Sequence, residues 1–120
     1  MLRGNTERSN NFRVDSSIST RSASLNDYKG TGYDRGHLVP AGDMKDSYRS
    51  MSESFFMSNM SPQDPSFNRG GWKRLESLVR SWAEKNELYI VTAGVLKESL
   101  PKIGTNGVSI PKYFYKIIIL

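Results

Sequence analysis

His37 is the only histidine of the chain, and it ends the tetrapeptide Asp34-Arg35-Gly36-His37. A neutral imidazole, with an ordinary pKa near 6.5, can accept a proton at neutral pH, so His37 is a candidate general base. A lone histidine is more often a surface residue or a satisfied core residue. Its neighbours along the chain therefore have to decide between these interpretations.

Side chains with oxygen ligands follow at Asn59, Asn68 and Glu76. Amide and carboxylate oxygens suit Mg²⁺ or Ca²⁺ rather than zinc, which would need cysteine, absent from this chain, or several histidines. Each residue also has a simpler interpretation. Asn68 could be only a helix N-cap, Glu76 could be a solvated helix residue, and Asn59 begins a glycosylation sequon, a match that is common by chance. Asp34 could orient a neighbour or pair with Arg35.

Apolar residues between Asn68 and Asn86 recur at spacings of three and four, which predicts one long amphipathic helix with Trp72 and Trp82 in the core. Asn86 is its expected C-terminal stop. A helical turn is also expected around residues 47–51. Residues 1–29 are polar and rich in Ser, Asn and Arg, which favours an irregular segment partly wrapped on the core.

Four strands are expected around this helix. Gly30–Val39 reads as a turn leading into a strand, and Ser54–Ser61 as a second strand stopped by Pro62. Leu88–Leu96 has no charged side chain and reads as a central buried strand. A turn at residues 106–107 precedes the last strand, Tyr113–Leu120.

Three motifs in a fixed order resemble the DNA/RNA non-specific endonucleases of the ββα-metal (His-Me finger) type. They are Asp-Arg-Gly-His at 34–37, Ser-Asn-x-x-Pro-Gln at 58–63 and Asn-x-x-x-Trp-x-x-Leu-Glu at 68–76. The resemblance runs from about Arg8 to Leu120. It implies an α+β fold, with a ββα-metal finger core, a mostly antiparallel sheet and one long amphipathic helix. Because family members extend further in both directions, residues 1–120 are expected to be a single nuclease domain truncated at both ends.

The resemblance also implies Mg²⁺-dependent hydrolysis of DNA and RNA to 5′-phosphorylated ends, with Mn²⁺ or Ca²⁺ as substitute ions. His37 would be the general base, Asn68 the direct metal ligand and Glu76 a partner of the metal's waters, with Arg35 and Asn59 in support. This set is chemically sufficient, because phosphodiester hydrolysis needs a base for water and a cation for the developing charge. On a shared helix Asn68 and Glu76 would lie about 12 Å apart, so Asn68 is expected at or before the N-cap.

Basic residues near the motifs are candidates for binding the nucleic-acid backbone. They are Arg8, Arg69, Lys73 and Arg80, whereas Arg74 and Lys85 fit a solvated helix face equally well. No zinc finger or RNP motif is present, which favours DNA and RNA binding without sequence specificity.

Composition limits the alternatives. The 120 residues are 37% apolar and 24% charged, with a formal net charge of +5 and no cysteine. Such a chain has one modest core, no disulfide framework and no apolar run that could span a membrane, and its charge favours polyanionic partners. Walker A, Gly-x-Ser-x-Gly and His-Glu-x-x-His motifs are absent, which excludes the usual NTPases, serine hydrolases and zinc proteases.

Two alternatives to a nuclease stay open, namely a nucleic-acid-binding module without catalysis and a phosphoesterase for small substrates. The compartment is open as well, and only the family resemblance favours a secreted or periplasmic protein. The final strand carries Lys116 as its one charged guard, so self-association or a homodimer through this strand is expected.

Overall fold

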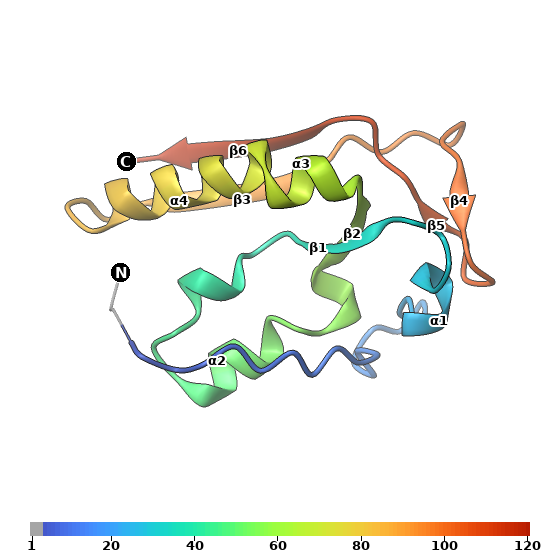
Figure 1. Ribbon diagram of the computed structural model, residues 1–120, viewed down its shortest axis with the longest axis horizontal. Helices are drawn as coiled ribbons and strands as arrows, with labels where there is room; N and C mark the ends of the chain where they lie inside the picture. Colours follow the sequence, from blue (N-terminus) through green and yellow to red (C-terminus); the bar gives the residue numbers. More distant parts are fainter. Residues whose placement is uncertain (1–3) are drawn as a thin grey trace.

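The computed structural model describes residues 4–120, whose strands form three two-stranded antiparallel sheets (Figure 1). β1 (Asp34–His37) pairs with β2 (Met60–Gln63), β3 (Tyr89–Gly94) with β6 (Phe114–Ile119), and β4 (Lys102–Ile103) with β5 (Val108–Ser109). The predicted α+β fold with antiparallel pairing is confirmed. The strands form three separate pairs instead of one continuous sheet, and only β4 and β5 are joined by a short turn.

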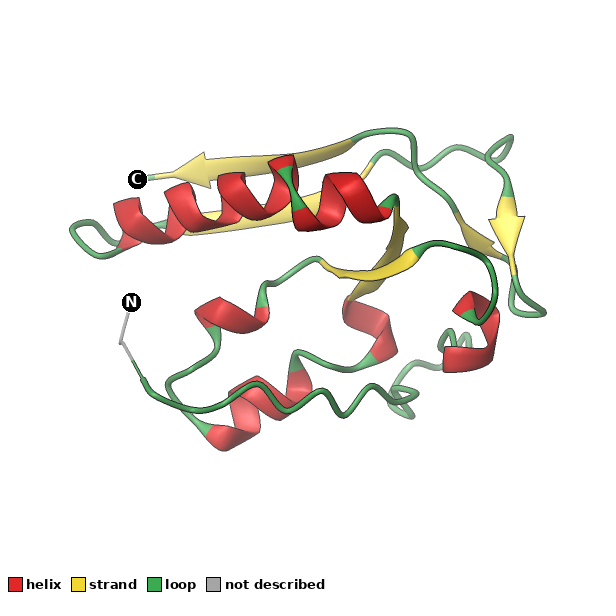
Figure 2. Ribbon diagram, in the orientation of Figure 1, coloured by secondary structure: helices red, strands yellow, loops and turns green. Residues whose placement is uncertain are grey.

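The helical segments lie mainly on two sides of the β1–β2 pair, where Figure 2 shows them in red. They are α1 (Leu25–Tyr28), η1 (Ala41–Asp43), α2 (Tyr48–Glu53), η2 (Met57–Asn59), α3 (Pro65–Arg69) and α4 (Gly71–Ala83). The expected helical turn at 47–51 is confirmed as α2, with the Ser47 hydroxyl accepting from the Ser50 amide at its N-terminus. Within residues 4–120, no helix is both long and apolar enough to cross a bilayer.

The predicted strand at Ser54–Ser61 is wrong in position, because β2 begins only at Met60. Ser54 still caps α2, and its amide donates to the carbonyl oxygens of Ser50 and Met51. Phe55 is fully buried without belonging to a strand. In the sequence, an apolar residue that is buried in this way cannot be distinguished from a residue of a strand. Pro62 lies inside β2 opposite Arg35, which is tolerated because a two-stranded sheet leaves one edge of each strand without a partner.

The predicted helix over residues 68–86 is interrupted at Gly70. The φ and ψ angles of Gly70 are −112° and −104°, outside the helical region, and a Cβ there would lie 2.5 Å from the Ser66 carbonyl oxygen. The break leaves Asn68 in the last turn of α3, two residues before the Gly70 N-cap of the long helix, which agrees with its expected place at or before that N-cap. A short helix and a long helix therefore present different faces to the rest of the fold.

α4 also ends earlier than predicted, at Ala83, and the Asn86 amide donates back to the Trp82 carbonyl oxygen at 3.2 Å. Trp72 is buried against the β3–β6 sheet as expected, but the side chain of Trp82 is 44% exposed, so its assignment to the core is wrong. The apolar side chains of α4 extend around a wider part of the helix surface than the two-stranded β3–β6 sheet covers.

The β3–β6 sheet buries only one face. Its outer face carries the register pairs Tyr89–Ile119, Val91–Ile117 and Ala93–Tyr115, in which the large side chains are exposed. The prediction of a central buried strand at Leu88–Leu96 is therefore wrong. Lys116 is not a guard of the outer face either, because its Nζ donates to Thr92 Oγ1 and lies 4.9 Å from the Trp72 ring centroid, on the α4 side.

The N-terminal segment is irregular and wraps on the core, as predicted for its described part. The backbone of Arg13 forms an isolated β-bridge with that of Phe56. The Arg13 amide donates to the Phe55 carbonyl oxygen, and the Arg13 carbonyl oxygen accepts from the Met57 amide. Further along, the Asp27 carboxylate is 1% exposed and accepts from the backbone amides and side chains of Ser24 and Asn106. Burial alone would raise the pKa of Asp27, but these hydrogen bonds lower it below its usual value. Asp27 thus fixes α1 to the β4–β5 turn.

Candidate functional site

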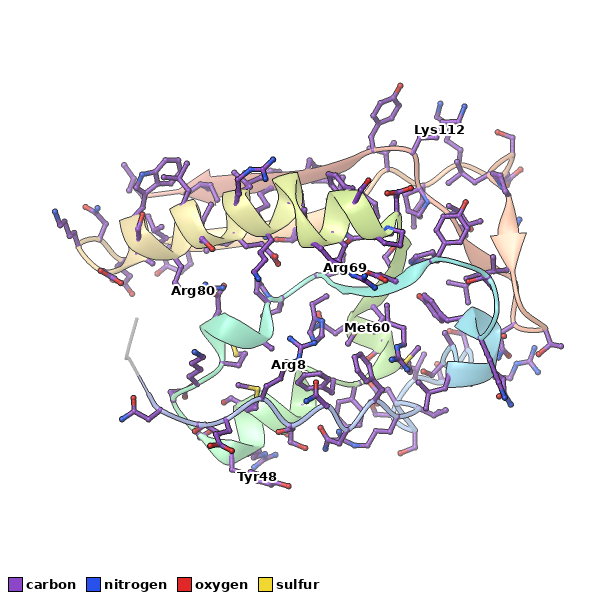
Figure 3. All side chains as sticks on the ribbon, in the orientation of Figure 1. Arg8, Tyr48, Met60, Arg69, Arg80 and Lys112 are labelled. Carbon is purple, nitrogen blue, oxygen red and sulfur yellow. The ribbon has the colours of Figure 1, made fainter. Side chains whose placement is uncertain are left out.

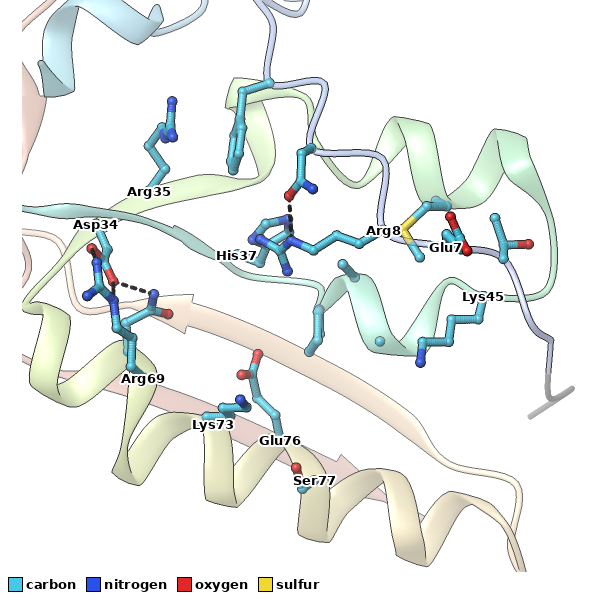
Figure 4. A pocket seen from close by; sticks show the side chains of 18 of the residues that line it. Glu7, Arg8, Asp34, Arg35, His37, Lys45, Arg69, Lys73, Glu76 and Ser77 are labelled. Carbon is cyan, nitrogen blue, oxygen red and sulfur yellow. Dashed lines mark hydrogen bonds and ion pairs between the residues drawn. The ribbon is translucent and has the colours of Figure 1, made fainter.

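A cleft of about 1200 Å³ separates the β1–η1 segment and the N-terminal segment from α3 and α4 (Figure 4). Every predicted site residue except Asn59 lines it. The lining residues from that prediction are Arg8, Arg35, His37, Asn68, Arg69, Lys73, Glu76 and Arg80. The structure therefore brings together residues that are separated by as many as 72 positions in the sequence.

His37 lies at the end of β1, 9% exposed, with its ring edge-to-face against Phe55 at 4.7 Å between centroids. Its Nε2 is buried and has no hydrogen-bond partner among the described residues, and the side chain is one of those that line the cleft. Burial, together with the positive charges of Arg8 and Arg35, lowers the pKa of His37 to about 4. The imidazole is consequently neutral at physiological pH, the form that a general base requires.

Asn59 supports the chain that follows His37 and does not enter the cleft. Its carbonyl oxygen accepts from the Leu38 amide, and its Oδ1 accepts from the Val39 amide at 2.9 Å. Its Nδ2 donates to the carbonyl oxygens of Val39 and Ser54. Because these hydrogen bonds engage the side-chain amide, Asn59 supports the chain that follows His37 and is not an accessible acceptor for a glycan.

Asp34 orients Asn68, the predicted metal ligand. The Asp34 carboxylate accepts from Asn68 Nδ2 at 2.9 Å and from Arg69 at 2.8 and 2.9 Å, so its partner is Arg69 and not Arg35. A carboxylate only accepts at neutral pH, which fixes the amide with nitrogen toward Asp34 and oxygen away from it. The free Asn68 Oδ1 is a hard oxygen donor of the kind that Mg²⁺ prefers.

Glu76 projects from α4 into the same cleft, as Figure 4 shows. Burial raises the pKa of its carboxyl to about 7, although the charges of Lys116, Arg80 and Lys73 act in the opposite direction. Within residues 4–120, no three His, Cys, Asp or Glu side chains converge on one point. The donor set at Asn68 and Glu76 therefore fits a hydrated cation with few protein ligands, as Mg²⁺ commonly is, and does not fit zinc.

The arginines of the cleft fall into two groups. Arg69 is bound by Asp34, and Arg80 Nε pairs with Asp43 Oδ1 at 2.6 Å, so each of these arginines also joins α3 or α4 to the β1–η1 segment. Figure 3 shows both reaching across from the helices, with Arg8 entering from the other side. In the described part of the chain, Arg8 and Arg35 have no carboxylate partner, and both lie against aromatic rings instead.

Three residues of this arrangement were not predicted as site residues. Asp43 and Phe12 carry no motif, and their roles depend on partners 37 and 25 positions away in the sequence. Asp34 did carry a signal, since it begins the tetrapeptide that ends in His37. The pairing of Asp34 with Arg69 could not be predicted from the sequence, because the adjacent Arg35 was the more obvious partner for its charge.

Comparisons with known proteins identify the family of this chain. Residues 2–120 match the DNA/RNA non-specific endonuclease family. The chain is 35% identical to human mitochondrial endonuclease G over 134 residues, and 38% identical to nuclease C1 of Cunninghamella echinulata over 112 residues. These alignments cover 99% and 82% of this chain. A solved structure of an EndoG/EndoGI complex superposes with a TM-score of 0.84 at 36% identity and covers 94% of this chain.

The relatives are longer than this chain, which spans 44% of human endonuclease G, 43% of nuclease C1 and 52% of the solved EndoG chain. The match nevertheless extends over nearly all of the 120 residues and includes the cleft with its histidine, asparagine and glutamate. The chain belongs to the DNA/RNA non-specific endonuclease family.

Proposed function

We propose that this chain carries the active site of a Mg²⁺-dependent endonuclease that hydrolyses phosphodiester bonds of DNA and RNA without sequence specificity. One observation carries the proposal. A buried, neutral histidine and an asparagine with a free amide oxygen line one basic cleft, and separate elements hold each of them in place. The nuclease names of the relatives support the same reaction class.

His37 performs the proton transfer in this proposal. Its neutral imidazole accepts a proton from a water molecule as that water attacks the phosphorus atom. Arg8 and Arg35 hold phosphate oxygens on the same side of the cleft, and the bound phosphate then stabilises the imidazolium that forms. Burial keeps the base neutral before substrate binds, and the charges of the two arginines add to this effect because they disfavour a third cation beside them.

Asn68 and Glu76 occupy the opposite side of the cleft. Asn68 Oδ1 would hold Mg²⁺, for which Mn²⁺ or Ca²⁺ could substitute, and Glu76 would accept hydrogen bonds from its waters. The bound ion supplies positive charge to the phosphoryl oxygens and the departing 3′ oxygen. Lys73 and Arg69, at the same wall, would contact the backbone of the substrate, which carries no base sequence information.

Cleavage should depend on both His37 and the metal. Incubation of supercoiled plasmid and of RNA with the protein and Mg²⁺ should give nicking and degradation, and EDTA should stop both. His37→Ala should abolish cleavage and leave nucleic-acid affinity within about threefold, because the base acts in the transition state. Binding without any metal-stimulated cleavage by the unmutated chain would instead establish the alternative, a catalytically inactive nucleic-acid-binding fragment.

The titration of His37 tests its environment directly. As the only histidine, it gives a single set of imidazole resonances in a proton NMR titration. We expect the midpoint near pH 4 in the folded chain without nucleic acid, below the ordinary value of 6.5, so that the neutral base persists through the mildly acidic range. A midpoint at 6.5, with folding verified by circular dichroism at each pH, would show that the imidazole is not enclosed.

Metal titrations should separate the roles of Asn68 and Glu76. Asn68→Ala should raise the Mg²⁺ concentration for half-maximal cleavage and lower the maximal rate, because it removes a direct ligand. Glu76→Gln should have the smaller effect, since an amide oxygen still accepts a hydrogen bond from a metal-bound water. A larger effect of Glu76→Gln on the Mg²⁺ requirement would reverse these assignments.

We also propose that copies of this chain associate through β6 and the apolar outer face of the β3–β6 sheet. Neither strand pairs on its other edge with a strand from residues 4–120, and the outer face carries no charged side chain. Exposed edges and apolar faces of this kind favour pairing with another copy.

Sedimentation over a range of concentrations tests this association. Ile117→Lys should shift the distribution toward monomer, because it places a charge at the centre of the face. Leu78→Lys is the matched control, since Leu78 is equally exposed at 47% but lies on α4. An unmutated chain that stays monomeric at high concentration, or equal effects of the two substitutions, would contradict the proposal.

A further inference from the structure

Phe12 lies between two functional side chains of the cleft. Its ring packs edge-on against His37, with 5.9 Å between centroids, and the Arg35 guanidinium carbon lies 3.9 Å from the centroid of the same ring. A third contact, at 4.9 Å, joins Phe12 to Phe55, which itself packs on His37. One aromatic side chain thus touches both the candidate base and a candidate phosphate ligand.

The backbone beside Phe12 is held firmly enough to position its ring. The Asn11 side-chain amide donates to Ser52 Oγ at 2.8 Å, and Arg13 makes two backbone hydrogen bonds to the chain at Phe55 and Met57. The Arg13 guanidinium also donates to the Ser52 carbonyl oxygen. Phe12 is therefore fixed from both sides, although the segment that carries it has no regular secondary structure.

Each of the other arginines of the cleft has a polar side chain that holds it, whereas the contact given for the Arg35 guanidinium is the Phe12 ring; Arg8, which lies on Phe55, also donates to Asn10 Oδ1. Arg69 and Arg80 are held by carboxylates, which also neutralise part of their charge. Arg35 has no carboxylate partner within residues 4–120, and a guanidinium on an aromatic face keeps its full charge and its outward N–H groups. A ring is thus a support that leaves the cation available for an anion.

We propose that Phe12 is a positioning residue that holds Arg35 on the cleft wall beside His37, so that Arg35 meets a substrate phosphate in a fixed orientation. The inference rests on the proposed function, in which Arg35 binds the substrate backbone. In this inference, the apolar side chain of Phe12 increases the affinity for substrate indirectly, because it orients Arg35.

The test is a double-mutant cycle in binding, measured in EDTA so that no cleavage occurs. Fluorescence anisotropy with a labelled DNA duplex gives the dissociation constants of the unmutated chain, Phe12→Leu, Arg35→Met and the double variant over a range of salt concentrations. Phe12→Leu should weaken binding about three- to fivefold, the order expected for one cation–π contact. Arg35→Met should lower the slope of log affinity against log salt by about one, and Phe12→Leu should then add no further loss.

Two further variants separate positioning from general packing. Phe12→Tyr keeps the aromatic face and should restore affinity, and Phe12→Met replaces the ring if the leucine variant is not folded. Phe114→Leu is the matched control, because the Phe114 ring packs on Phe67 and Trp72, and none of these three residues lines the cleft or contacts the segment of Phe12. It should leave the affinity unchanged.

The proposal fails if Phe12→Leu weakens binding equally with and without Arg35, or if Phe114→Leu weakens it as much. It fails also if Phe12→Tyr gives no recovery. A chain that binds nucleic acid and shows the expected cycle, but does not cleave with Mg²⁺, would overturn the proposed nuclease function and leave the positioning role intact.

Discussion

The Asp34 carboxylate joins the strand that carries the histidine to the helix that carries the asparagine. Its three hydrogen bonds, to one amide and one guanidinium, connect β1 with α3 across 34 and 35 positions of sequence. The Arg69 side chain is 73% exposed, so the ion pair itself contributes little to the free energy of unfolding, of the order of 1 kcal/mol or less. Asp34 matters mainly for the geometry of the site. Without its carboxylate, the Asn68 side-chain amide could rotate, and one contact that sets the distance between the two sides of the cleft would be lost.

A second carboxylate repeats this arrangement at the other end of the same segment. Asp43, in η1, binds Arg80 of α4, and these two side chains are more enclosed than the first pair. His37 lies between the two attachment points, with its ring against phenylalanine and its chain supported by Asn59. The cleft is therefore braced by polar contacts at its ends and by aromatic contacts at its centre. The low pKa of His37 follows from the centre, where burial and unpaired arginines coincide.

The sequence allowed prediction of what depends on local pattern and on ordered motifs. All but one of the predicted site residues line the cleft, and the antiparallel α+β class and the strands at β1 and β6 could also be expected from the sequence. The break at Gly70 could not, because it depends on the close approach of the Ser66 carbonyl, and the periodicity of apolar residues continues through it. The exposure of Trp82 and the inward position of Lys116 were missed for a related reason. Both depend on how wide a face the two-stranded β3–β6 sheet can cover, which is a tertiary property. The pairs Asp34–Arg69 and Asp43–Arg80 are contacts between distant residues, and no local pattern identifies them.

The buried contact between Asp27 and Asn106 sets the order in which the molecule can be completed. Asn106 is synthesised 79 residues after Asp27, and closing so long a loop costs conformational entropy that is recovered only when the β4–β5 turn is in place. α1 contributes Leu25 and Tyr28 to one end of the cleft, so that end acquires its final support only when the segment around Asn106 has folded against it. This wall of the cleft is therefore built by two segments that meet only through a long-range contact, so its completion depends on the folding of the β4–β5 turn.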